Sequence, residues 1–477
     1  MKTTAFTLER KHIRKMLIRP ELWIIFLFVI RWVGITNPPL ETGHNWRQCT
    51  GLMVARNFYE TDGNILFPRM NETEGKADVF GMEFPSMNYA HALMAKLWGY
   101  RHWYGRLINL IVSTLGLWMF VLLLRRLRFD EHMVLASVLA LGCSIWFSFS
   151  RKTMPDTYCI SLAFVALYFA SCYFDNGHWW QLVLYVLFGA LAVLSKIPAG
   201  IWFVLLVPVL LMKTIPSKRR IILAVGTLLP VAVSVWWYFI WCPHLSAEYG
   251  HWYNLGKSFS EGVSDVKSHL PETLDNFYFD AFCGFVFFGV FLFGIIMAFV
   301  RKQYRLLIGF ALVFAVFVLY IFKSGFFFYH HNYYSIPIAP AMAVMAGYGL
   351  TQMPKRWMTW VLLFAGCVEG VANQQHDFFI RDNQLYKMRL EEVADKVSKR
   401  NDLIMVNGNG NPQWIYLAHR KGWIYNDDDL SDTVYVEKAG QNGCRYIFVD
   451  LHVYPDLALD KTMVYKDDDF VVYATGF

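Results

Sequence analysis

The sequence predicts an all-α polytopic membrane protein with about 11 transmembrane helices, followed by a small α/β domain outside the membrane. The chain has 477 residues, of which 56% are hydrophobic and 17% are charged, whereas soluble domains carry about 25% charged residues. Apolar runs of about 17–22 residues recur along the chain, and each can cross the hydrocarbon core of a bilayer. Residues 376–477 instead alternate short apolar runs with polar, Gly- and Asp-rich stretches.

The apolar runs define the expected spans in order. The first is short and contains Arg31, but no small-residue cleavage site follows it, so we predict a retained span and not a signal peptide. The expected spans are 22–36, 105–124, 132–150, 156–173, 180–195, 198–212, 220–241, 279–299, 304–322, 335–351 and 357–373.

Basic residues orient these spans. They gather at alternate connections, which the positive-inside rule assigns to the cytoplasm, together with the N-terminus. The net charge of +7 suits such loops and gives no support for nucleic-acid binding. The basic segments are 9–19, 125–129, 213–220, 301–305 and 354–357.

The opposite side receives a long first loop, 37–103, and the segments 149–156, 195–198, 242–278 and 323–334. Within the first loop, residues 47–60 have helical spacing, which predicts an amphipathic helix lying at the membrane interface.

Two domains follow from this organisation. Residues 1–375 form the predicted transmembrane domain, including the first loop. Residues 376–477 contain strand-like runs at 402–408, 444–450 and 470–477, and their number suits a small α/β domain.

Three cations fall on the outer side, against the usual charge bias. They are Arg151 and Lys152 in "SRKTMPD" and Lys196 in "LSKIPAG". A single outer lysine is commonly a snorkelling side chain in contact with water. Three cations on tight links instead favour an anion held at the outer membrane surface.

Outer carboxylates and aromatic residues accompany these cations. Glu41 and Glu83 lie in the first loop, and Asp156 follows Pro155 at the start of a span, where it is either a helix-terminal partner or a functional group. Segment 323–340 carries His331, Tyr333 and Tyr334. An aromatic belt at the lipid–water boundary explains its phenylalanines better than it explains these three residues.

Together these groups suit one kind of chemistry. A carboxylate can act as general base, cations can stabilise a leaving phosphate, and tyrosines can bind a phosphate or a sugar. A lipid-phosphate-linked sugar presents its phosphate at the depth of these links. We find no phosphate-binding glycine loop and no metal-ligand spacing, so we expect neither a cofactor nor a metal.

Four motifs, over roughly residues 20–350, resemble those of the GT-C membrane glycosyltransferases that use polyprenyl-phosphate sugars. The most similar group is that of the bacterial protein O-mannosyltransferases and lipid A aminoarabinose transferases. The matching stretches are "FGMEFP" with Glu83, "RKTMPD" with Asp156, "LSKIPAG" with Lys196, and "HHNYYSIPIAP" with His331, Tyr333, Tyr334 and Pro337.

The sequence also departs from this family. The usual acidic pair before an alanine–arginine is replaced by Arg47-Gln48, and the lysine that usually follows the glutamate is Phe84. The resemblance therefore leaves either Glu41 or Glu83 as the base. It implies that Asp156 orients a cation or the sugar. It also implies that Arg47, Arg151, Lys152 and Lys196 bind the phosphate, while His331, Tyr333 and Tyr334 complete the donor site.

The expected function is transfer of a monosaccharide from undecaprenyl phosphate to a lipid, glycan or protein acceptor, with inversion, on the periplasmic side of a bacterial inner membrane. The alternative is a transporter or flippase of an anionic lipid-linked sugar. A transporter should carry polar groups at mid-membrane depth and often a repeat between its halves, and we see no clear repeat.

Overall fold

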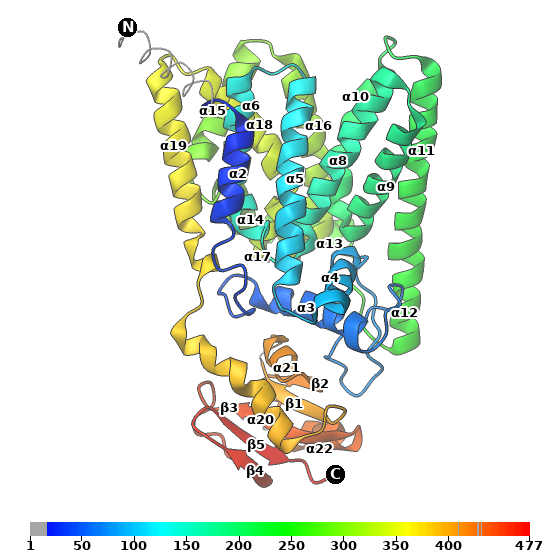
Figure 1. Cartoon of the computed structure of the whole chain (residues 1–477), viewed down its shortest axis with the longest axis vertical. Helices are drawn as coiled ribbons and strands as arrows, with labels where there is room; N and C mark the ends of the chain where they lie inside the picture. The colour runs from blue at the N-terminus through cyan, green and yellow to red at the C-terminus, as the bar shows by residue number, and fades with distance from the viewer. Residues whose placement is uncertain (1–16, 409, 427–428, 431) are drawn as a thin grey trace. The chain divides into compact units, whose positions relative to one another are not determined.

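The computed structural model describes residues 17–477 except 409, 427–428 and 431. The described chain is mostly helical and forms two compact units (Figure 1). The first unit comprises the described residues up to Ile35, Arg106–Trp237 and Asn254–Phe378. The second comprises Thr36–Gly105, Tyr238–Tyr253 and Phe379–Phe477. Most of the first basic segment, residues 9–16, lies outside the described residues.

Helices make up the first unit. Its α-helices are α2 (Pro20–Ile30), α5 (Tyr104–Arg126), α6 (Glu131–Gly142), α7 (Trp146–Phe149), α8 (Pro155–Asn176), α9 (Trp179–Ser195), α10 (Leu206–Leu211), α11 (Ser217–Val235), α13 (Phe259–Ser268), α14 (Leu270–Asp275), α15 (Val286–Val300), α16 (Tyr304–Ser324), α17 (Phe326–His330), α18 (Ala339–Thr351) and α19 (Arg356–Asn373). Shorter 3-10 or π segments are η1 (Ile197–Leu205), η3 (Asn276–Asp280), η4 (Asn332–Ser335), η5 (Gln375–Phe378) and η2 (Trp236–Trp241), of which residues 238–241 belong to the second unit.

Every expected span contains a helix, but the predicted count of 11 is not confirmed. In the described chain, four helices are long and apolar enough to cross a membrane, namely Tyr104–Arg126, Pro155–Asn176, Ser217–Tyr249 and Tyr304–Ser324. Some expected spans divide into two pieces. The run 132–150 becomes α6 and α7, and the run 198–212 becomes η1 and α10.

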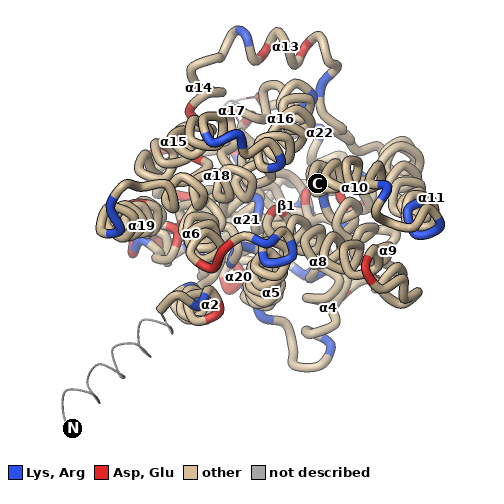
Figure 2. The backbone as a smooth tube through the Cα atoms, turned by 90° about the horizontal axis from the view of Figure 1, so that it is seen from above, with Lys and Arg blue, Asp and Glu red and all other residues tan. Residues whose placement is uncertain are grey.

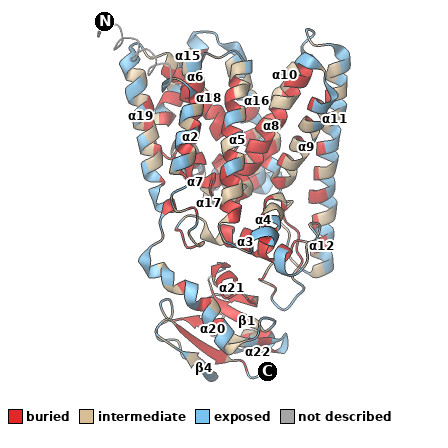
Figure 3. Ribbon diagram, in the orientation of Figure 1, coloured by how far each residue is buried: buried red, intermediate tan, exposed pale blue. Residues whose placement is uncertain are grey.

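The outer helices of the first unit carry many exposed residues (Figure 3), and a number of these are large and apolar. Leu228 of α11 is 63% exposed and Phe364 of α19 is 72% exposed. A soluble protein rarely leaves a contiguous apolar surface open to water. These faces therefore suit contact with lipid, and the protein is membrane-embedded.

The basic connections of the first unit share one end. The links 125–129, 213–220, 301–305 and 354–357 all lie at the end that faces the viewer in Figure 2. This placement is the one that the alternation of basic loops in the sequence predicts.

The second unit contains a sheet and its helices. Its helical segments are α3 (Asn45–Glu60), α4 (Ser86–Trp98), α12 (Cys242–Tyr249), η6 (Asp382–Arg389), α20 (Leu390–Val397), α21 (Gln413–Leu417) and α22 (Thr433–Gln441). Its strands are β1 (Leu403–Asn407), β2 (Lys421–Tyr425), β3 (Cys444–Asp450), β4 (Thr462–Lys466) and β5 (Phe470–Ala474).

The described strands form one sheet in the order β2-β1-β3-β5-β4. Strand β1 is parallel to β2 and β3, and β5 is antiparallel to β3 and β4. The three strand-like runs predict β1, β3 and β5 correctly, whereas β2 and β4 were not predicted. The first loop covers the β2 edge, because Gly422 donates its N–H to the carbonyl of Asn71 at 2.9 Å.

The helix predicted at 47–60 is α3, but it does not present one apolar face. Its residues 48, 49 and 51–58 are buried on several faces. Cys49, Leu52 and Met53 belong to the same apolar core as residues of α20, α21 and the sheet. The sequence placed loop 37–103 with the membrane region, whereas in the structure this loop shares a compact unit with residues 379–477.

Candidate active site

Lys196 lies in the first unit at the turn between α9 and η1. Its backbone is extended, with φ −166° and ψ 127°. Pro198 stands in the first turn of η1, and proline cannot supply the N–H that would continue α9. The sequence therefore breaks the helix at this point, and the turn presents the lysine side chain.

Asp156 is the described ion-pair partner of Lys196. The Nζ of Lys196 lies 2.5 Å from Oδ1 of Asp156. Pro155 occupies the first turn of α8 after the extended residue Met154, a position that proline favours. The carboxylate of Asp156 is 5% exposed, and its Oδ2 has no hydrogen-bond partner in the described chain. Asp156 therefore stands at the start of α8 and is also paired with Lys196.

Aromatic residues from η4 cover the lysine. Its Nζ lies 4.8 Å from the ring centroid of Tyr333 and 5.6 Å from that of Tyr334, within the range of cation–π attraction. His331 stacks on Tyr333 at 5.1 Å with an interplanar angle of 14°. The segment is held near η1 because Trp202 donates its Nε1–H to the carbonyl of Pro337 at 3.1 Å.

Five predicted site residues therefore meet in the first unit: Asp156, Lys196, His331, Tyr333 and Tyr334. The sequence did not predict Tyr320 of α16, which stacks on Tyr334 with centroids 5.7 Å apart and planes 8° apart. Tyr320 lies within an apolar run, where an aromatic residue gives no signal distinct from ordinary packing.

Arg151 and Lys152 have different described partners. The Nζ of Lys152 lies 2.6 Å from Oδ2 of Asp377. Arg151 donates to the main-chain carbonyl of Asp377 at 3.1 Å, and its guanidinium lies 4.2 Å from the ring of Phe378. The side chains of Lys152 and Asp377 are only 2% and 7% exposed. Asp377 was not predicted, because it follows the last expected span and the sequence assigned it to the outer domain.

Burial and nearby groups act in opposite directions on the pKa of Asp377. Burial is the largest single influence and would raise the pKa of Asp377, but the charge and hydrogen bond of Lys152, together with His376 and Ser148, outweigh it, so the pKa is lowered. Removing one partner of such a buried ion pair lowers the free energy of unfolding of the protein, because the other charge stays buried without compensation.

The first-loop candidates belong to the second unit. Glu83 forms an ion pair with Arg47 at the start of α3. Glu41 is 1% exposed. Either carboxylate is chemically able to take a proton from an acceptor, and the choice between them stays a prediction.

Close packing holds the Glu83 segment in place. Cys242 of α12 donates its thiol to the carbonyl of Met82 at 3.1 Å. A Cβ atom on Gly81 would lie 2.7 Å from the carbonyl oxygen of Cys242. The glycine in "FGMEFP" is therefore required by this close approach.

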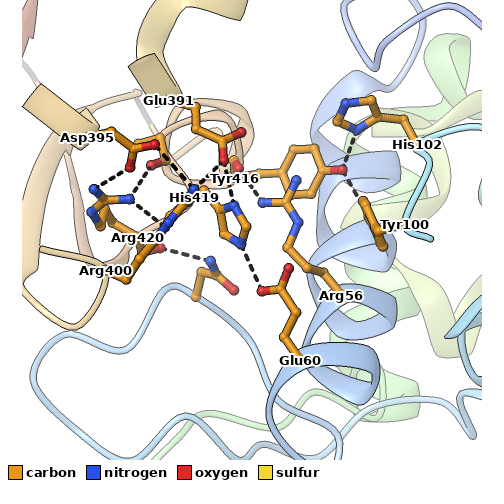
Figure 4. A network of polar contacts seen from close by, with 12 residues as sticks. Arg56, Glu60, Tyr100, His102, Glu391, Asp395, Arg400, Tyr416, His419 and Arg420 are labelled. Atoms are coloured by element: carbon orange, nitrogen blue, oxygen red, sulfur yellow. Dashed lines mark hydrogen bonds and ion pairs between the residues drawn. The ribbon is translucent and has the colours of Figure 1, made fainter. Parts of the chain in front are cut away.

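A polar network holds the other end of α3 (Figure 4). Arg56 lies between two tyrosine rings, 4.1 Å from Tyr416 and 5.1 Å from Tyr100. His419 places one ring nitrogen 2.8 Å from Glu60 and the other 2.8 Å from Glu391. The hydrogen bond from His419 is the main cause that lowers the pKa of Glu391 to about 2.

Metal ligands are not gathered in the described chain: no group of three or more His, Cys, Asp or Glu side chains is placed to hold an ion there. The arrangement in the first unit instead combines one ammonium, one carboxylate and three aromatic or imidazole rings. The ammonium can bind a phosphate group, and the rings can pack against a polar ring attached to that phosphate.

Comparisons with known proteins relate this chain to glycosyltransferases. Residues 83–239 match the model of a family described as dolichyl-phosphate-mannose-protein mannosyltransferase. A search of the curated proteins found no match. The matched range includes Glu83, Asp156 and Lys196.

Solved structures show the fold. ArnT from Cupriavidus metallidurans bound to undecaprenyl phosphate has a TM-score of 0.62 and 15% identity, over 95% of this chain and 97% of that chain. The oligosaccharyltransferase from Archaeoglobus fulgidus has a TM-score of 0.60 and 13% identity, over 91% of this chain and 68% of that chain. Another structure of the Archaeoglobus enzyme, AglB, holds an inhibitory peptide and a dolichol-phosphate, with a TM-score of 0.56, 13% identity and coverage of 91% and 70%.

The resemblance to the GT-C glycosyltransferases is therefore confirmed, through the family match over residues 83–239 and through the fold.

Proposed function

We propose that this chain is a membrane glycosyltransferase that moves a monosaccharide from polyprenyl phosphate to a lipid, glycan or protein acceptor. The observation that carries the proposal is the meeting of Lys196, Asp156, Tyr333 and Tyr334 from three separate links of the first unit. A cation paired with a carboxylate beneath aromatic rings offers both a phosphate ligand and a surface for a sugar.

The donor phosphate would bind at Lys196. Its ammonium can stabilise the negative charge that grows on the phosphate as the sugar leaves. Tyr333, Tyr334 and His331 would contact the phosphate or the sugar, and Asp156 would keep the ammonium in place. Arg151 and Lys152 are left out of this site because their described contacts include Asp377 and Phe378.

The reaction requires a base on the acceptor, and Glu83 or Glu41 would supply it. The carboxylate takes the proton from an acceptor hydroxyl or amine, and the acceptor atom forms a bond to the anomeric carbon. The bond from that carbon to the phosphate oxygen breaks, and its electron pair leaves with polyprenyl phosphate. A single displacement of this kind inverts the anomeric centre.

The expected topology places the basic links of the first unit in the cytoplasm of a bacterium and the donor site on the periplasmic side of its inner membrane. The common end of four basic connections supports this orientation (Figure 2). Eleven crossings with an outer C-terminal region would follow. An alkaline phosphatase fused after residue 380 should then be active, and an inactive fusion would contradict this topology.

Donor turnover tests the function directly. Purified protein is incubated with a synthetic polyprenyl-phosphate sugar and, in separate reactions, a lipid, a glycan or a peptide acceptor, and release of polyprenyl phosphate is measured. We expect release by the wild type and a large loss in Lys196→Ala. If the wild type carries the intact donor across vesicles without cleaving it, the chain is a transporter and the proposal is wrong.

A further inference from the structure

Asn109 is a buried polar residue within the apolar helix α5. Its side chain is 0% exposed, and it lies in the run "LINLIVSTLG". An amide taken out of water costs free energy unless its donors and acceptor find partners. Burial of the Asn109 amide is therefore tolerated only if its donors and its acceptor are hydrogen-bonded.

The amide nitrogen of Asn109 binds the link between α7 and α8. Its two N–H groups are shared among the main-chain carbonyls of Phe149 at 2.9 Å, Lys152 at 2.8 Å and Met154 at 3.1 Å, so at least one of these hydrogen bonds is bifurcated. One side chain thus gathers three carbonyls of the link that ends just before Pro155-Asp156.

The amide oxygen of Asn109 binds the other side of this segment. It accepts hydrogen bonds from Ser113 at 2.8 Å and from Thr157 at 3.1 Å. Thr157 follows Asp156 directly. The two ends of the amide are not interchangeable, because a rotated amide would place its oxygen against three carbonyl oxygens.

We propose that Asn109 is a positioning residue, which holds the backbone on both sides of Asp156 and so directs that carboxylate toward Lys196. The proposed effect of Asn109 on the Asp156–Lys196 pair does not depend on the proposed function. Its effect on turnover rests on the proposed function. A catalytic group displaced by about 1 Å can lose about 100-fold in rate, so this support matters for the reaction.

The first experiment measures the coupling between Asp156 and Lys196 by a double-mutant cycle on thermal unfolding of the full chain. Asp156→Asn and Lys196→Met are combined in the wild type and in Asn109→Leu. We expect the coupling to be measurable with Asn109 and to vanish with leucine. Coupling of equal size in both backgrounds would overturn the inference.

Gln374 provides a control next to the same link, because its amide oxygen accepts the N–H of Ser148 at 3.1 Å but its described hydrogen bonds do not include residues 149–157. Its amide also gathers carbonyls, from Ser144 at 2.9 Å and Gly370 at 2.8 Å, and it is 3% exposed. Gln374→Leu should lower the unfolding temperature like Asn109→Leu but keep the Asp156–Lys196 coupling. If both variants abolish the coupling, its loss reflects general loosening and the assignment to Asn109 fails.

Milder variants keep the inference testable if Asn109→Leu does not fold. Asn109→Ala removes the amide without adding a charge or a larger side chain, so we expect it to weaken the coupling as leucine does. Thr157→Val keeps the shape and removes the hydroxyl that donates to Asn109 and also contacts Ser113 and the carbonyl of Phe149, and a smaller loss is expected. Unchanged coupling in both variants would contradict the positioning role.

The second experiment measures release of polyprenyl phosphate from a synthetic donor. Asn109→Leu should lower kcat by about 100-fold with a smaller change in KM, and it should add nothing to the loss in Asp156→Asn. Multiplied losses in the double variant would show that Asn109 does not act through Asp156. A wild type that cleaves no donor would contradict the proposed function, and the coupling experiment would still decide the role of Asn109.

Discussion

Two lysine–aspartate pairs lie in the first unit, and the sequence predicted the same phosphate-binding role for both lysines. Lys152 pairs with Asp377 at 2.6 Å, with side chains 2% and 7% exposed. Lys196 pairs with Asp156 at 2.5 Å, with side chains 17% and 5% exposed. The first pair is enclosed, whereas the second retains a partly exposed ammonium next to tyrosine rings.

This difference separates stability from function. An enclosed pair is neutralised within the protein, so its main effect is on the free energy of unfolding. A cation that stays partly exposed can meet a charged ligand, and its desolvation is completed only when that ligand binds. Similar charges in similar links can thus do different work, depending on what surrounds them.

The largest expected effect concerns the enclosed pair. Asp377→Leu leaves the Lys152 ammonium buried without its partner and should lower the free energy of unfolding by about 3–5 kcal/mol. Denaturation of the purified protein in mixed micelles measures this loss.

The double variant Lys152→Met with Asp377→Leu sharpens the comparison, because replacing both charges by apolar groups is often neutral. It should recover most of the stability and keep donor turnover. A stable double variant without turnover would return Lys152 to the phosphate site and break the distinction between the pairs.

The next effect concerns the open pair. Lys196→Ala removes the proposed phosphate ligand and should lower turnover by about 100- to 1,000-fold, as expected for loss of a group that stabilises developing charge. Lys196→Arg keeps the charge with another shape and should lose less. Lys355→Ala, at an exposed lysine of the basic end, serves as the control and should turn over donor normally.

A smaller effect is expected at the aromatic cover. Tyr334→Leu removes a ring 5.6 Å from the ammonium of Lys196, and a cation–π contact contributes about 0.5–2 kcal/mol. The KM for the donor should rise by a corresponding factor of about 2–30. Tyr334→Phe keeps the ring, so an equal loss in both variants would show that the hydroxyl is the group that matters.

The smallest expected effect concerns a third ionic contact, which lies in the second unit and is partly exposed to water. His419 holds Glu391, whose side chain is 41% exposed and whose pKa is lowered from 4.5 to about 2. A lowered carboxyl pKa stabilises the fold above pH 4.5, and this contribution is lost as the pH falls from 4.5 toward 2.

As the pH falls through that range, the unfolding temperature should therefore decrease less steeply in Glu391→Gln than in the wild type. Glu437→Gln, at an exposed glutamate of α22, should follow the wild-type curve. Parallel curves for Glu391→Gln and the wild type would show that the His419 contact contributes no acid sensitivity.

The sequence pointed to Asp156, Lys196 and the 331–334 segment, which the structure brings together, because these residues mark the turns themselves. Pro155 and Pro198 interrupt apolar runs, and a charge at such a turn is costly unless it has a partner. His331, Tyr333 and Tyr334 likewise precede a proline at a span entrance. The supporting residues escaped prediction because nothing local distinguishes them. Tyr320 and Asn109 stand in apolar helices, and their roles depend on segments distant along the chain.

The fold shows the same division. Composition, apolar run length and the alternation of basic loops by themselves determine a helical membrane protein with a small sheet domain, because burial in lipid and charge placement act on each segment separately. Only the tertiary structure decided that the first loop packs with the C-terminal residues, and that Lys152 is enclosed while Lys196 stays partly exposed. Those outcomes depend on which distant side chains fill the neighbouring volume, and no local pattern encodes that choice.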